Sequence, residues 1–144
     1  MTARMIRYER LFVEFLYYFN VTRDYFECHE VLEQLWMEEG RDPLLQGLLQ
    51  VAVGLYHHRN GNVSGARKLF GAAVDKLAHH PPDALGIDLG RLLADAREYK
   101  AKLERSDGPP AFYDLDIHIV DPALADKLEE LKADPPVPHD EEGE

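Results

Sequence analysis

The sequence predicts an all-α protein, a compact bundle of five to six helices around one central antiparallel helical hairpin. Three observations carry this prediction. Apolar residues recur at spacings of three and four along most of residues 4–105, which is the period of an amphipathic helix. Glycine and Asp-Pro pairs divide these stretches where helices end and restart. Residues 112–120 instead alternate with a period of two, which predicts an extended segment laid against the helices or an edge strand.

The elements follow in order along the chain. Helices are predicted over residues 4–19, 25–39, 43–60, 63–79, 84–105 and from 122 onward, with breaks at 20–23, 40–42, 61–62 and 80–82 and a linker at 106–110. Asp24 is the predicted N-cap of the second helix and Asp83 that of the fifth, because a short carboxylate accepts from the free amides of a first turn. We expect residues 1–133 to form one helical domain. Residues 134–144 hold three prolines and five acids and are predicted to be a disordered acidic tail.

The central hairpin places polar side chains on faces that should be apolar. His29 and Glu33, one turn apart, interrupt the apolar stripe of the helix that starts at residue 25. Folding the hairpin about residue 41 sets Glu33 opposite Gln50 and His29 opposite Gly54, with the helices close together beside the imidazole. The predicted ligand pocket between the two helices comprises His29, Glu30, Glu33, Trp36, Gln46, Gln50 and His57, with Phe26 and Tyr56 as further walls.

Several motifs of this region recur together in a known family. They are Phe19-Asn20, residues 25–36 (YFECHEVLEQLW), Leu45-Gln46-Gly47, Gly61-Asn62, residues 65–69 (GARKL) and Gly86-Ile87-Asp88. With this spacing the chain resembles the domain-of-unknown-function 309 family over roughly residues 16–105. The resemblance implies a compact all-helical domain with no established activity. The chain departs from the family in Cys28 and in its acidic tail.

Composition narrows the classes of partner. Acidic residues number 27 against 16 basic ones, a net charge of −11, which argues against a nucleic-acid or anionic-membrane surface and suits work in high salt. The single cysteine excludes an internal disulfide framework and a cysteine-built metal site. No apolar run has the length of a membrane span and no signal peptide precedes the first helix, so we expect a cytoplasmic protein.

Four functions remain open from the sequence. The first is a cytoplasmic binding or interaction protein that uses the polar pocket. The second is a hydrolase in which Glu33 orients His29 and the other ring nitrogen moves protons. It includes a divalent-metal version with His29 and Glu33 as ligands and His57 or another glutamate as the third. The third is a tetratricopeptide-like scaffold, suggested by small and aromatic residues at Gly54, Ala66, Phe70 and Ala73. The fourth is a purely structural polar network. We also expect a homodimer through the first or fifth predicted helix.

Overall fold

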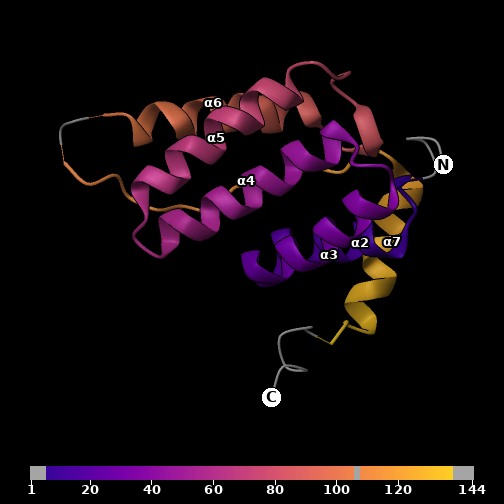
Figure 1. Ribbon diagram of the computed structural model, residues 1–144. Coiled ribbons are helices and arrows are strands. Elements are labelled where there is room, and N and C mark those ends of the chain that lie inside the picture. The colour runs from indigo at the N-terminus through magenta and orange to yellow at the C-terminus, as the bar shows by residue number, and fades with distance from the viewer. Residues whose placement is uncertain (1–5, 106–107, 138–144) are drawn as a thin grey trace.

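The computed structural model describes residues 6–105 and 108–137, and over these ranges the chain forms six α-helices (Figure 1). They are α2 (Arg10–Tyr17), α3 (Tyr25–Glu38), α4 (Pro43–Arg59), α5 (Val63–Leu77), α6 (Leu89–Leu103) and α7 (Pro122–Ala133). A π-helical turn, η1 (Tyr18–Thr22), continues α2, and a 3-10 turn, η2 (Ala84–Gly86), precedes α6. The all-α prediction is confirmed. Among the helices described, none combines the length and the apolar character needed to cross a bilayer.

The helices begin where the sequence provides capping side chains. In five of them an Asp or Asn oxygen accepts a hydrogen bond from a free amide of the first turn, as N-caps do. These residues are Asp24, Asp42, Asn62, Asp88 and Asp121, with oxygen-to-nitrogen distances of 2.8–3.1 Å. Two of these caps precede a proline at the first helical position, where its missing N–H costs nothing.

Helix α4 is the centre of the bundle, because it packs on α3 along one side and more extensively on α5 along the other (Figure 1). Gly47 and Gly54 allow the close approach to α5. A Cβ at Gly54 would lie 2.9 Å from the Phe70 ring, and one at Gly47 would lie 2.9 Å from Leu77 Cδ2. The prediction that Gly54 faces His29 is therefore wrong. The two glycines are one heptad apart and share the face that meets α5.

The predicted helix over residues 84–105 is shorter at its start. Helix α6 begins at Leu89 with Asp88 as its N-cap, while Asp83 makes no capping hydrogen bond. Ile87 instead pairs with Ile119 in an isolated antiparallel bridge. The flanking backbone groups also bond to the extended segment, so this tertiary pairing overrides the local helical pattern.

The first predicted helix also differs from the structure. Residues 4–5 lie outside the described ranges, and residues 7–9 form a turn before α2. The predicted break at 20–23 is largely the π-helical turn η1, which ends at Arg23 in the left-handed region with φ 58°. Of the other predicted segments, residues 106–107 of the linker and 138–144 of the tail lie outside the described ranges. Residues 134–137 form no helix or strand.

The extended segment predicted at residues 112–120 lies along the helices as expected, and in the structure it spans residues 109–121. The Asn20 side chain donates to the Ile117 carbonyl at 2.8 Å and accepts from the Ile117 amide at 2.9 Å. Arg23 donates to the carbonyl of Leu115. Leu115 and Ile117 are buried, so the alternating pattern marks the side of this segment that faces the core.

The carboxylate of Asp121 ties the N-terminal turn to α7. It accepts hydrogen bonds from Tyr8 Oη at 2.7 Å and Arg7 Nη1 at 3.0 Å, which lower its pKa from 3.8 to about 2. A carboxylate with a lowered folded-state pKa stabilises the fold above its ordinary pKa, and this contribution is lost as the pH falls from about 4 through about 2. We therefore expect Asp121→Asn to be less stable than the parent chain in urea at pH 5. The difference should shrink at pH 2, and an equal difference at both pH values would contradict it.

Candidate functional site

A groove runs along the outer side of the central hairpin, between α3 and α4. It consists of two adjoining hollows that share His29 and Val53. We call it the α3/α4 groove. Its walls come from one face of each helix, and Leu69 of α5 also contributes to the lining. The hairpin geometry deduced from the sequence, with its tight turn at residues 39–42, is what brings these faces together.

The first hollow has both polar and apolar side chains in its lining and a volume of about 200 Å³. Trp36 and Gln46 lie at the end near the hairpin turn, and Glu33 and Gln50 lie one turn further along. This is the pairing that the fold about residue 41 predicts. The full lining is His29, Glu33, Trp36, Gln46, Leu49, Gln50, Val53 and Leu69.

The second hollow is mostly apolar and has a volume of about 280 Å³. Five of its six lining residues have rings, and the Phe26 ring lies 6.2 Å from the Tyr56 ring and 6.4 Å from the His29 ring. Phe26 is 38% exposed, which is unusual for a phenylalanine and leaves its ring available to a ligand. The lining is completed by Tyr25, Val53 and His57.

His29 lies between two carboxylates of its own helix. Its Nε2 is 3.3 Å from Glu33 Oε2, and its Nδ1 is 3.4 Å from Glu30 Oε1. The side chains are 36%, 47% and 39% exposed for His29, Glu33 and Glu30, so none is buried in the way that a sealed network would require. Both ring nitrogens face an acid, whereas the hydrolase hypothesis needs one nitrogen free to meet a substrate.

Two side chains that line the first hollow each have a buried polar atom without a hydrogen-bond partner. The atoms are the Trp36 indole Nε1, a donor, and Gln50 Oε1, an acceptor. A buried polar group that stays unpaired costs about 1–3 kcal/mol. A ligand in the hollow that carries an acceptor and a donor could satisfy both atoms once the two side chains turn toward it.

The predicted pocket residues therefore fall into three groups. Five of them line the first hollow together: His29, Glu33, Trp36, Gln46 and Gln50. His57 lies in the second hollow, where its Nδ1 is 3.4 Å from Asn62 Nδ2. Glu30 does not line either hollow and acts only through its contact with His29.

The described residues do not assemble a metal centre. No group of three or more His, Cys, Asp or Glu side chains within them is arranged to hold an ion. Cys28, on a different face of α3, is fully buried and contacts the Phe15 carbonyl at 3.8 Å. Burial raises the pKa of its thiol well above the ordinary value, so it is not a thiolate nucleophile.

The pocket predicted from the sequence omits four residues that line the groove: Tyr25, Leu49, Val53 and Leu69. The missing information was the position of α5, which packs so closely on α4 that Leu69 reaches the groove. The neighbouring Gly47 and Gly54 were the available signal, because small residues one heptad apart indicate which face carries a close helix contact.

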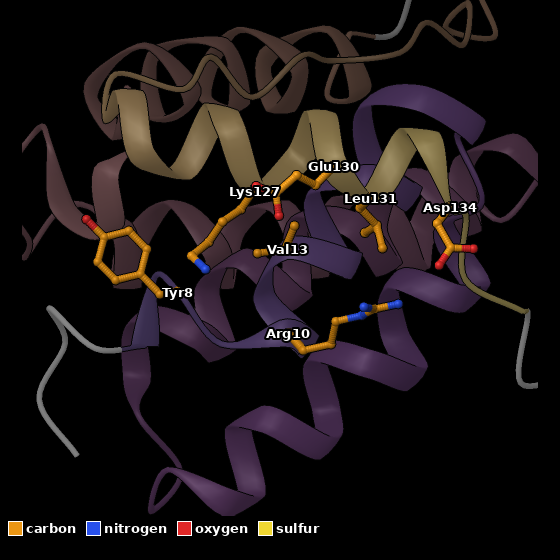
Figure 2. A pocket seen from close by; sticks show the side chains of 7 residues that line it. All are labelled: Tyr8, Arg10, Val13, Lys127, Glu130, Leu131 and Asp134. Atoms are coloured by element: carbon orange, nitrogen blue, oxygen red, sulfur yellow. The ribbon is translucent and has the colours of Figure 1, made fainter.

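A separate hollow of about 330 Å³ lies between α2 and α7. Figure 2 shows its charged side chains spread along the two helices instead of converging on one point. Arg10 is engaged by Glu14 at 2.8 Å, and Lys127 lies 5.8 Å from the centre of the Tyr8 ring. None of its described lining atoms is both buried and unpartnered, so it makes a weaker site than the α3/α4 groove.

Comparison with known proteins agrees with the motifs. Residues 12–69 match the family described as Domain of unknown function (DUF309). The chain is 43% identical over 91 residues to Uncharacterized protein YpuF of Bacillus subtilis (strain 168), which covers 60% of this chain and 52% of that protein. It is 28% identical over 97 residues to an Uncharacterized protein of Aquifex aeolicus (strain VF5), covering 65% of this chain and 29% of that protein.

The chain thus spans about half the length, or less, of the curated relatives that it matches. The matched family region contains every residue that lines the α3/α4 groove, from Tyr25 to Leu69. The resemblance that the motifs predict is therefore confirmed over residues 12–69, where the chain matches the DUF309 family model.

Proposed function

We propose that this chain is a binding protein that holds its ligand in the α3/α4 groove. The observation that carries the proposal is that two residues lining one hollow, Trp36 and Gln50, each have a buried polar atom without a partner, Nε1 and Oε1. An aromatic hollow adjoins them through His29 and Val53. Apolar walls with a few convergent polar groups are typical of ligand sites.

The other functions have less support. The lining of the groove, as described, includes no Ser, Thr or Cys to act as a nucleophile for a hydrolase. The close approach of α4 and α5 at Gly54 would suit a tetratricopeptide hairpin, yet a stack of such repeats needs about three pairs. The apolar stripes of α2 and α6, on which the expected homodimer depends, are buried within the chain itself. The proposal places the binding in the cytoplasm, where a single unpaired cysteine is ordinary.

A small neutral amide tests this function directly. Benzamide has a ring for the second hollow and an amide that can accept from Trp36 and donate to Gln50. Trp36 is the only tryptophan of the chain, so its indole NMR signal reports on the groove without ambiguity. We expect benzamide to shift this signal with a dissociation constant of about 1 mM or weaker, as suits a fragment.

The variant Val53→Phe should abolish the shift, because Val53 lines both hollows and a larger side chain fills the groove. The matched control is Val120→Phe, which adds the same bulk at an exposed residue of the extended segment. Benzamide that leaves the Trp36 signal unmoved, or that binds Val53→Phe as well as the parent chain, would refute the proposed function.

A further inference from the structure

The lining of the α3/α4 groove contains one Asp, Glu, Lys or Arg side chain, which is Glu33. Glu33 lies beside His29, whose other ring nitrogen meets Glu30, just outside the lining. Helix α4 has no Asp, Glu, Lys or Arg between Pro43 and His58. The two arginines at the ends of the hairpin stack on aromatic rings of the lining: Arg41 lies over the Trp36 ring at 5.3 Å, and Arg59 lies over the Tyr25 ring at 4.8 Å. The charge between these two ends is therefore the carboxylate of Glu33, which matches a cationic partner group.

The distance between the two hollows matches the distance between two side chains that lie two turns apart on one helix. Phe26 and His57 mark the second hollow, and Glu33 and Gln50 mark the first. The separation is seven residues on each helix, 33 − 26 and 57 − 50, which corresponds to about 10 Å at 1.5 Å per residue. Residues i and i+7 of a third helix lying along the groove have this same spacing.

We propose that the α3/α4 groove holds an amphipathic helix of a partner protein. This helix places an apolar side chain in the second hollow, against Phe26 and Tyr56, and two turns along it places a Lys or Arg beside Glu33. The inference rests on the proposed function and names its partner. A small molecule fits the groove less well than a helix does, because the groove consists of two adjoining open hollows, each of a size for one side chain. A second copy fits less well because each copy carries a net charge of −11.

Model peptides provide the test. Three helical, alanine-based peptides carry Leu and Arg, Leu and Glu, or Ala and Arg at positions i and i+7, each synthesised in both orders. They are titrated into the full chain while the Trp36 indole signal is followed. We expect one Leu-Arg peptide to bind about tenfold or more tightly than the other two kinds, as expected when a hydrogen bond to a charged group is gained.

Matched variants locate the cation. Glu33→Gln should remove most of the preference for Arg over Glu in the peptide. Glu38→Gln is the control, since it removes the same charge from an exposed position of α3 where Glu38 only accepts from Gln34. An equal loss in both variants would mean that the net charge of the chain, and not the groove, attracts the peptide, and it would overturn the inference.

The remaining outcomes distinguish a failure of this inference from a failure of the proposed binding function. If benzamide moves the Trp36 signal and no peptide does at about 1 mM, the groove binds ligands but not a basic helix. Equal binding of the Leu-Glu and Leu-Arg peptides would likewise mean that the groove binds ligands without selecting a basic helix. If neither benzamide nor any peptide moves the signal, both proposals fail. A Trp36 signal that shifts with protein concentration alone, together with a dimer in sedimentation, would make the occupant a second copy and overturn the inference.

Discussion

Replacing His58 with alanine is expected to lower the free energy of unfolding by about 2–4 kcal/mol. His58 is 6% exposed, and its two ring nitrogens have different partners. Nε2 lies 3.1 Å from the Pro110 carbonyl, to which it donates, and Nδ1 lies 2.5 Å from Tyr99 Oη, from which it accepts. The variant leaves both partners unpaired and opens a cavity beside Phe112, whose ring is 5.7 Å away.

The neighbouring His57→Ala is the matched control for this effect. His57 is only partly buried, and its ring contact with Asn62 is a long 3.4 Å. Urea unfolding of both variants, followed by far-UV circular dichroism, should show a large loss for His58 and a change within about 0.5 kcal/mol for His57. Hydrogen exchange should also quicken around residues 110–113 in the His58 variant alone. Equal losses in both variants would contradict the assignment.

Gly54→Ala is expected to destabilise the chain, although alanine favours helices more than glycine does. The new Cβ would lie 2.9 Å from two ring carbons of Phe70. That ring cannot turn aside, because it is fully buried and stacked on Tyr99 with centroids 4.6 Å apart. Overpacking of this kind costs about 1–3 kcal/mol, against a gain in helix propensity of about 1 kcal/mol.

The variant Gly71→Ala separates the cost of overpacking from the gain in helix propensity. A Cβ at Gly71 would meet only Lys100 Cε, at 3.5 Å, which is an ordinary contact with a flexible side chain. Both variants gain the same helix propensity, so their difference in unfolding free energy measures the overpacking alone. We expect Gly71→Ala to be the more stable by about 1–3 kcal/mol in thermal and urea unfolding. Equal stability would show that α4 and α5 are further apart than described.

Much of this fold could be predicted because its signals are local. Asp24 caps its helix in the structure as predicted, and Asp42 caps the helix that the Asp-Pro pair predicts to restart at Pro43. The short turn before Pro43 determines that α3 and α4 run antiparallel, and helical periodicity then determines which residues face each other. The pairings of Glu33 with Gln50 and of Trp36 with Gln46 within one hollow follow from these two facts.

The parts that could not be predicted depend on contacts between distant residues. Residues 84–88 have a helical pattern and leave it because Ile87 pairs with Ile119, far along the chain. The sequence alone does not show which neighbouring helix Gly54 contacts. A glycine in an α-helix indicates a close approach but does not identify the helix that approaches. The exposure of His29 and Glu33 depends on how far α3 and α4 separate, which periodicity does not encode.

The hydrogen bonds between Asn20 of η1 and Ile117 of the extended segment bear on the order in which the chain folds. Asn20 and Ile117 are 97 residues apart in sequence, whereas α3, α4 and α5 are joined by short turns. Closing a long loop reduces chain entropy before its contacts return any stabilisation, so short-range pairs assemble sooner than long-range ones. The helical hairpins therefore form early, and the return of residues 109–121 onto Asn20 is the step that completes folding.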